Sequence, residues 1–185
     1  MVCGVDEVGR GCLAGPVVAC ALIMPPHVFI EGVDDSKKLT HAKRLLLHDV
    51  ITQQCVCWSI GMVDSVGIDH MNILQATLSA MSQAIGALDV KPDAVLVDGP
   101  YLPEISKDVY ARAIKSGDSI CHVIAAASIL AKVYRDNLMV AASKEYPMYG
   151  FERHKGYGTK EHVQAIAEHG LCPLHRVTFK TGGPK

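Results

Sequence analysis

A fully apolar run at residues 94–97 restricts the possible folds of this chain more than any other segment. Its sequence is Ala-Val-Leu-Val, and Asp98-Gly99 ends it. A strand with one solvated face alternates polar and apolar residues, whereas a strand covered on both faces is apolar throughout. The run therefore predicts a strand inside a sheet that carries helices on both faces, which is an α/β fold.

The other segments supply the remaining strands and helices of such a fold. Residues 3–8 and 17–24 are apolar and flank a Gly-rich turn, which predicts two strands with hairpin spacing. Between residues 68 and 88, apolar residues recur as on the buried face of one helix. The expected strands are residues 3–8, 17–24, 55–62, 94–97 and 108–114, and the expected helices are residues 40–54 (capped by Thr40), 68–88, 117–144 and 159–169. We therefore expect a mixed five-stranded sheet flanked by helices, with a short helical C-terminal segment.

Length and composition favour a single domain outside the membrane. The chain has 185 residues, of which 49% are hydrophobic, so residues 1–185 can form one domain with a substantial core. We expect residues 181–185 to fray. The longest apolar run near the start, residues 17–24, is far shorter than the roughly 20 residues of a membrane span. Seven scattered cysteines, an odd number, favour a reducing compartment, so we expect a cytoplasmic protein.

Charge is unevenly divided along the chain. Residues 1–100 carry six Lys/Arg and eleven Asp/Glu, a net charge of −5, whereas residues 101–185 carry twelve and eight, a net charge of +4. A locally basic surface is what contacts to phosphate require. Such a division is also typical of an ordinary solvated face, so by itself it indicates little about function.

Four acidic residues lie where predicted strands end or a predicted helix begins. Asp6 and Glu7 close the first strand, Asp98 closes the apolar run, and Asp118 follows a glycine at a helix start. Ligands of open α/β sheets bind beyond the strand ends, so we expect these side chains to converge there. Clustered carboxylates repel one another and are stable mainly around a divalent cation, and oxygen ligands suit Mg²⁺ or Mn²⁺. The sequence thus predicts a metal site.

Each of these acids also has an ordinary structural role open to it. Asp98 could be a turn residue, and Asp118 could be the N-cap of its helix. Asp6 and Glu7 are harder to explain in that way, because adjacent charges inside an apolar segment are costly when they are buried unpaired. Neighbours on a regular strand point to opposite faces, so both acids reach one site only if the strand ends or twists there.

The acidic pair and several later segments resemble the ribonuclease HII family. They occur in the family's order: Asp6-Glu7-Val8-Gly9-Arg10-Gly11, Asp35-Ser36-Lys37-Lys38-Leu39, Val97-Asp98-Gly99, Gly117-Asp118, Ala125-Ala126-Ala127-Ser128-Ile129-Leu130-Ala131-Lys132 and His154-Lys155-Gly156-Tyr157. The resemblance implies a ribonuclease H-like fold whose metal-binding, catalytic carboxylates are Asp6, Glu7, Asp98 and Asp118. It leaves Asp136 as a structural residue that pairs within its helix. Cys12 and Pro100 depart from the family, where proline and asparagine are common, and this puts in doubt only the shape of two loops.

The resemblance also implies a substrate and a mechanism. The substrate is an RNA/DNA hybrid, or duplex DNA containing ribonucleotides, hydrolysed with two metal ions to leave 3′-hydroxyl and 5′-phosphate ends. Gly9, Arg10 and Gly11 would sense the ribose 2′-hydroxyl, which distinguishes RNA from DNA at one nucleotide. Tyr157 would pack on the sugar of the next nucleotide, and Lys37 would contact phosphate. We expect residues 150–185 to form a substrate-binding segment and the protein to be a monomer.

Two other functions remain open for the same residues. A related nuclease with the same fold could cut branched DNA or long hybrids, and only the Gly-Arg-Gly segment and Tyr157 argue against it. A hybrid-binding module without catalysis is disfavoured, because binding phosphate needs no cluster of negative charge. Structural alternatives also exist: the glycines could form a simple tight turn, Tyr157 could be a rim residue, and Lys37 could lie in a solvated turn.

Overall fold

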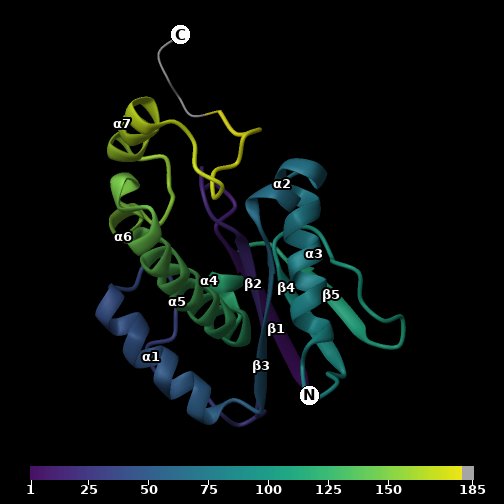
Figure 1. Ribbon diagram of the computed structural model, residues 1–185. Coiled ribbons are helices and arrows are strands. Elements are labelled where there is room, and N and C mark those ends of the chain that lie inside the picture. The colour runs from purple at the N-terminus through teal and green to yellow at the C-terminus, as the bar shows by residue number, and fades with distance from the viewer. Residues whose placement is uncertain (181–185) are drawn as a thin grey trace.

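Five strands form one mixed sheet in the order β3-β2-β1-β4-β5 (Figure 1). The strands are β1 (Val2–Val8), β2 (Val17–Met24), β3 (Cys57–Val63), β4 (Ala94–Asp98) and β5 (Tyr110–Ile114). The central strand, β1, runs antiparallel to β2 and parallel to β4. The computed structural model describes residues 1–180, so the fraying expected at residues 181–185 lies outside the described residues. The predicted mixed sheet of five strands is confirmed.

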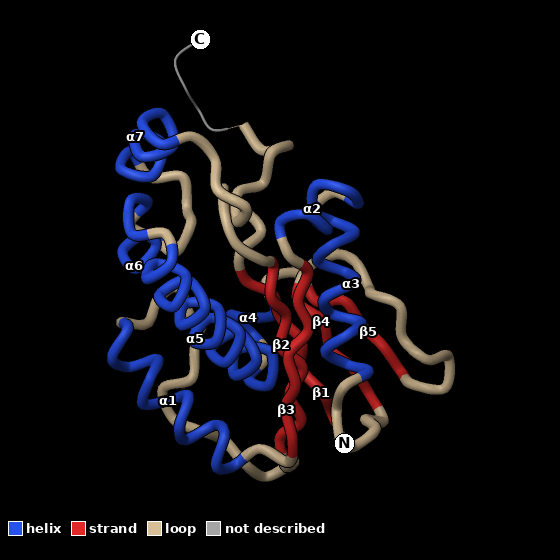
Figure 2. The backbone as a smooth tube through the Cα atoms, in the orientation of Figure 1, coloured by secondary structure: helices blue, strands red, loops and turns tan. Residues whose placement is uncertain are grey.

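Helices cover both faces of the sheet. They are α1 (His41–Gln54), α2 (Ser65–Met71), α3 (Ile73–Gly86), α4 (Gly117–Ile120), α5 (His122–Glu145), α6 (Phe151–His154) and α7 (Lys160–His169), with a 3-10 turn at Pro147–Tyr149. The helix α3 packs on one face, and α1 and α5 pack on the other, as the tube view in Figure 2 shows. Within residues 1–180, no helix combines the length and the apolar character that crossing a membrane requires.

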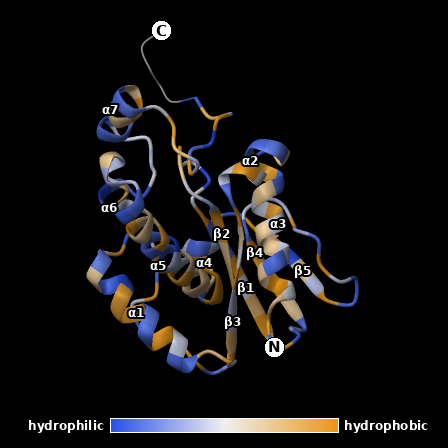
Figure 3. Ribbon diagram, in the orientation of Figure 1, coloured by the Kyte–Doolittle hydropathy of each residue, from blue (hydrophilic) through white to orange (hydrophobic). Residues whose placement is uncertain are grey.

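The hydrophobic core lies on both faces of β2, which is buried at all 8 of its positions. Ala19 and Ala21 belong to the core cluster on the α3 side, whereas Cys20 and Leu22 belong to the cluster that includes α1 and α5. Figure 3 shows hydrophobic residues along the strands and on the helix faces turned toward them. Strands covered on both faces are the environment that the apolar runs of the sequence predict.

Two helices that the sequence predicts as continuous are each divided in two, so the prediction is wrong at both places. The segment 68–88 forms α2 and α3, because Asn72 between them has a φ of 70° and caps α3 with its side chain. The segment 117–144 forms α4 and α5, with Cys121 between them in an extended conformation. The first helix begins where predicted, with Thr40 as its N-cap.

The C-terminal part of the chain folds back onto the turn between β1 and β2. The helices α6 and α7 pack with the end of α5 in an apolar cluster that contains Met139 and Phe151. The backbone amide of Leu13 donates to Gly156 O at 2.8 Å, and the amide of Arg176 donates to Leu13 O at 2.9 Å. The turn at residues 9–16 is therefore held between the central strands and the last described residues.

The close approach of α5 to β1 yields a stability prediction at Gly4. A Cβ at this position would lie 2.4 Å from the backbone carbonyl of Val123, so neither rigid element can accommodate it. We expect Gly4→Ala to lower the free energy of unfolding by about 3 kcal/mol. Urea denaturation checks this, with Gly86→Ala as the control, because a Cβ on Gly86 meets nothing within 4 Å. Equal stability of the two variants would contradict the packing described here.

Candidate active site

Three carboxylates meet at one end of the sheet. Because β1 and β4 are parallel neighbours with Val5 opposite Val97, the residues that follow, Asp6 and Asp98, lie side by side where the pairing of these two strands ends. One carboxylate oxygen each from Asp6, Glu7 and Asp98 lie within 4.8 Å of one another. Both members of the adjacent pair therefore reach the same site near the end of β1. Among residues 1–180 these three form the only such group of possible metal ligands.

Burial and mutual repulsion make this cluster unfavourable without a cation. Asp6 is only 3% exposed, and burial together with the negative charge of Glu7 raises the pKa of its carboxyl well above the ordinary value. Burial also raises the pKa of Glu7, although the guanidinium of Arg10, 3.6 Å away, opposes the shift. Groups that resist ionisation in this way are stabilised by a divalent cation, and three carboxylates are the oxygen donors that Mg²⁺ or Mn²⁺ prefers.

A glycine at the start of α4 brings the third acid into place. The amide of Gly117 donates a hydrogen bond of 2.6 Å to Asp98 Oδ1. A Cβ on Gly117 would lie 2.6 Å from the side chain of Ile124 and 3.3 Å from the same carboxylate oxygen. The glycine thus lets the backbone approach Asp98 closely, and it leaves the next residue, Asp118, beside the cluster.

Asp118 itself lies outside the group of three and is paired with Lys37. The Lys37 ammonium is 3.0 Å from Asp118 Oδ2 and 3.9 Å from Asp35 Oδ1. Partial burial acts to lower the pKa of Lys37, but the hydrogen bond and charge of Asp118 outweigh it and raise that pKa above the ordinary value. The side chain of Lys37 is still 77% exposed, so this lysine neutralises a buried acid while remaining open to solvent.

A cavity of about 220 Å³ opens over the acids. It is lined by Asp6, Glu7, Val8, Gly9, Arg10, Gly11, Ser36, Lys37, Asp98, Ser128, Lys132 and Tyr157. The structure therefore places three predicted carboxylates, the Gly-Arg-Gly segment, Lys37 and Tyr157 around one space.

Three polar residues that line this cavity were not predicted as site residues. Ser36 and Ser128 share a buried hydrogen bond of 2.8 Å between their hydroxyls. Lys132 pairs with Asp136 at 2.7 Å, one turn apart on α5, which is the pairing within a helix that the sequence suggested for Asp136. The available signal was polar residues, Ser128 and Lys132, inside the otherwise apolar segment 124–133. That pattern is typical of a helix with one end at a site.

Tyr157 stands beside the Gly-Arg-Gly segment, at the rim of the cavity. Its backbone forms an isolated β-bridge with Cys12, and the residue is 38% exposed. The ammonium of Lys132 lies 5.6 Å from the centre of its ring. An exposed aromatic ring beside the ammonium of Lys132 presents an apolar surface next to positive charge, as a sugar-phosphate backbone would require, whereas the guanidinium of Arg135, 5.9 Å from the ring centre, is buried beneath it.

Comparison with known proteins places this architecture among nucleases. Residues 3–182 match the family model of ribonuclease HII. The ribonuclease HII of Geotalea daltonii is 53% identical over 176 residues, which cover 95% of this chain and 81% of that protein. The ribonuclease HII of Acetivibrio thermocellus is 51% identical over 97% of this chain and 69% of that protein. The ribonuclease H2 structure from Pyrococcus horikoshii matches with a TM-score of 0.80 and 27% identity, over 97% of this chain and 94% of that one.

The mixed sheet and its cluster of carboxylates define a nuclease with a ribonuclease H-like fold. The chain belongs to the ribonuclease HII family. It is a metal-dependent endoribonuclease that degrades the RNA of RNA/DNA hybrids. The family that the sequence motifs suggested is confirmed.

The raised pKa values predict how one substitution changes the stability of the metal-free protein. Asp6→Asn removes a buried charge from a repulsive cluster, so we expect it to raise the free energy of unfolding at neutral pH by on the order of 1 kcal/mol. A raised pKa means that the wild type gains stability as Asp6 takes up a proton, so the advantage of the variant should disappear as the pH falls through that pKa. Urea denaturation in EDTA at several pH values measures both effects.

The control for this experiment is Asp89→Asn, which removes the same charge from an exposed position. It should leave stability almost unchanged. Added Mg²⁺ should stabilise the wild type more than Asp6→Asn, because the variant lacks a ligand charge. Equal stability of Asp6→Asn and wild type without metal, at every pH, would show that the carboxylates do not repel one another as their geometry indicates.

Proposed function

We propose that this enzyme also nicks duplex DNA on the 5′ side of a single embedded ribonucleotide. The observation that carries the proposal is the shared cavity, in which the acids lie beside the Gly-Arg-Gly segment and Tyr157. A long hybrid can be recognised by its shape, but a single ribonucleotide must be recognised at its own 2′-hydroxyl and at the junction that follows. The cavity has a candidate residue for each of these tasks.

Asp6, Glu7, Asp98 and Asp118 would hold two ions, Mg²⁺ or Mn²⁺. Such ions activate water and stabilise the leaving 3′-oxygen, which gives 3′-hydroxyl and 5′-phosphate ends. The first three residues already share a site, and Asp98 is oriented by the Gly117 amide. Asp118 is paired with Lys37, whose exposed ammonium can exchange this carboxylate for a substrate phosphate. Lys37 would thereby contribute to substrate binding as well as to the stability of the empty site.

The Gly-Arg-Gly segment would recognise the 2′-hydroxyl of the ribose, and Tyr157 would recognise the junction between the ribonucleotide and the DNA that follows it. Gly11 is exposed and has no atom within 4 Å of its Cβ position, so the backbone here can approach a ribose closely. Gly9 has a φ of 94° and a Cβ position occupied by Arg135, so a glycine is needed there to form the turn. The side chain of Arg10 points to Glu7, 3.6 Å away, which leaves sugar recognition to the backbone. The exposed ring of Tyr157 would pack on the next sugar, where the absence of a 2′-hydroxyl favours close contact.

The remaining proposals concern the binding segment, the oligomeric state and the compartment. Residues from about 150 onward would contribute to substrate binding within the single domain, since Tyr157 comes from this segment. One chain supplies all the proposed site residues, so a monomer would suffice for activity. Seven cysteines, all with free thiols, suit the reducing cytoplasm.

The first test of the proposed mechanism is Asp98→Asn. The change is nearly isosteric and removes one ligand charge, so we expect turnover to fall by at least about a thousandfold, the scale of losing a group that acts only in the transition state. Binding of hybrid should persist or improve, because a charge that repels phosphate is lost. The assay compares cleavage of a duplex with one ribonucleotide and of the matched all-DNA duplex, with Asp89→Asn as the charge control.

Near-normal turnover of Asp98→Asn at saturating Mg²⁺ would refute the assignment of Asp98 to the active site. Equal cleavage of the two duplexes by the wild type would refute the proposed substrate.

The second test separates the ring of Tyr157 from its hydroxyl. Tyr157→Ala removes the packing surface and should lower kcat/KM on a single embedded ribonucleotide by about ten- to a hundredfold, whereas Tyr157→Phe should retain most activity. The loss should be smaller on a continuous RNA strand, because a 2′-hydroxyl on the next sugar already disfavours close packing. Equal losses for both variants would assign the effect to the hydroxyl, and no loss for either would leave Tyr157 a structural residue.

A further inference from the structure

Arg176 is a buried cation that is bound by backbone carbonyls instead of an acid. It is 1% exposed, and its guanidinium donates to Gly9 O at 2.6 Å, to Arg10 O at 2.8 Å and to Gly15 O at 2.8 and 3.1 Å. Within residues 1–180, no carboxylate lies within 4 Å of it. Burial lowers the pKa of Arg176 to about 10, so it keeps its charge at neutral pH. All the bonds of this charged side chain thus go to the turn between β1 and β2.

Two of these bonds determine where two backbone amides point. A peptide unit is planar and trans, so its N–H points opposite to its C=O. The carbonyl of Gly9 shares a peptide plane with the amide of Arg10, and the carbonyl of Arg10 shares one with the amide of Gly11. A guanidinium that holds both carbonyls therefore aims both N–H groups away from itself, and the cavity over the acids is lined by Gly9, Arg10 and Gly11 but not by Arg176.

The two amides are available for a ligand. In the described part of the chain, neither the Arg10 amide nor the Gly11 amide donates a hydrogen bond, and both residues are exposed. Buried donors would have to be paired in the folded protein, whereas exposed ones can exchange water for a substrate oxygen. Two neighbouring donors at the rim of this cavity match the acceptor oxygens of a ribose.

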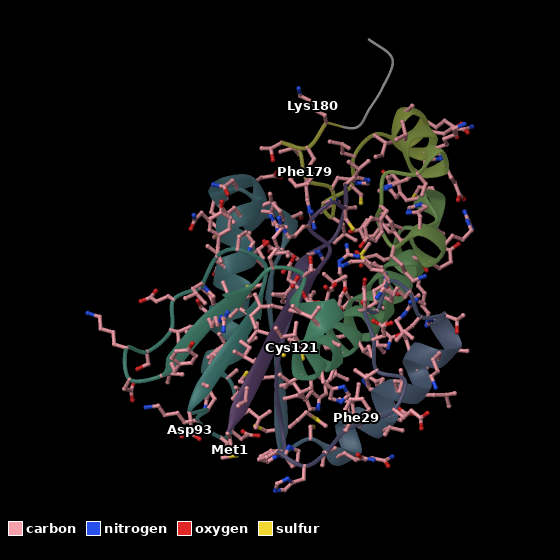
Figure 4. All side chains as sticks on the ribbon, turned by 180° about the vertical axis from the view of Figure 1, so that it is seen from behind. Met1, Phe29, Asp93, Cys121, Phe179 and Lys180 are labelled. Atoms are coloured by element: carbon pink, nitrogen blue, oxygen red, sulfur yellow. The ribbon has the colours of Figure 1, made fainter. Side chains whose placement is uncertain are left out.

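The guanidinium is itself held firmly in place. The Arg176 amide donates to Leu13 O at 2.9 Å, and the ring of Phe179 lies 5.0 Å from the guanidinium carbon. Figure 4 shows Phe179 in the last described segment, at the same end of the molecule as the turn. The amides of Val177 and Thr178, which follow Arg176, donate to the carboxylate of Asp69 in α2, at 2.9 and 3.0 Å. Arg176 is therefore fixed from two sides before any substrate binds.

We propose that Arg176 is a positioning residue for ribose selectivity, acting through the carbonyls of Gly9 and Arg10 to aim the Arg10 and Gly11 amides at the 2′-hydroxyl. This inference rests on the proposed reading of the sugar by the Gly-Arg-Gly segment. Arg176 touches neither the substrate nor the metal ligands, so its substitution should change which sugar is preferred rather than how strongly a duplex is held by its phosphates.

The structure contains a matched control in Arg135. This residue is also fully buried, and its guanidinium also donates to carbonyls, namely Ala14 O at 3.0 Å, Pro16 O at 2.9 Å and Lys155 O at 2.9 Å. It thus holds the far end of the same turn and donates to neither Gly9 O nor Arg10 O. A general loss of stability should affect variants of both arginines, whereas a loss of ribose selectivity should be specific to Arg176.

The experiment measures Kd, by fluorescence anisotropy in Ca²⁺, for a duplex with one ribonucleotide and for the matched all-DNA duplex. Arg176→Lys keeps the positive charge but lacks the planar guanidinium that can bind two carbonyls at once. We expect it to reduce the preference for the ribonucleotide duplex by about tenfold, which corresponds to the loss of one hydrogen bond to the sugar. Its Kd for all-DNA duplex should stay within about twofold of the wild type. Arg135→Lys should keep most of the preference. Circular dichroism and urea denaturation establish that both variants are folded.

A second measurement uses only the wild type, in case Arg176→Lys does not fold. The NMR signals of the Arg10 and Gly11 amides should shift more with the ribonucleotide duplex than with all-DNA duplex. Equal shifts would overturn the inference, and so would an Arg176→Lys variant that retains the full preference. A wild type that binds both duplexes equally would instead refute the proposed reading of the sugar itself, and the inference with it.

Discussion

The parallel pairing of β1 with β4 is the constraint on which the rest of the molecule depends. It places Asp6 beside Asp98 at one end of the sheet, although the two negatively charged side chains repel each other. A shift of one residue would turn a side chain instead of Gly4 toward α5, where the backbone of Val123 leaves no space for a Cβ, so this close packing fixes the register. The hydrophobic core thus stabilises a cluster of charges that would otherwise separate.

The sequence predicted those features of the fold and the site that depend on local pattern. The apolar run at residues 94–97 and its closing Asp98 identified a covered strand and an acid at its end, because both follow from side-chain alternation. Periodicity could not reveal the break at Asn72, since the apolar face continues across a single residue with positive φ. The motifs around Asp6, Gly9 and Tyr157 were recognisable as segments, and the structure places them around one cavity.

Contacts between distant residues could not be predicted from the sequence. The sequence offered Lys37 either as a contact to phosphate or as part of a solvated turn, and its pairing with Asp118, 81 residues later, was not predicted. The excess positive charge of the second half of the chain suggested a basic surface, but two of its cations, Arg135 and Arg176, lie inside the molecule. No local pattern distinguishes a guanidinium that binds three backbone carbonyls in the interior, as each of these two does, from one that faces solvent.

The fold-back of the C-terminal segment onto the turn at residues 9–16 has a consequence for the order in which the site is assembled. During synthesis, Arg135 and Arg176, which hold the carbonyls of this turn, leave the ribosome 119 or more residues after Pro16. Until then the turn is flanked by its two strands, but no guanidinium binds its carbonyls. Its glycines therefore allow it many backbone conformations. The turn is therefore made long before the residues that give it its final form.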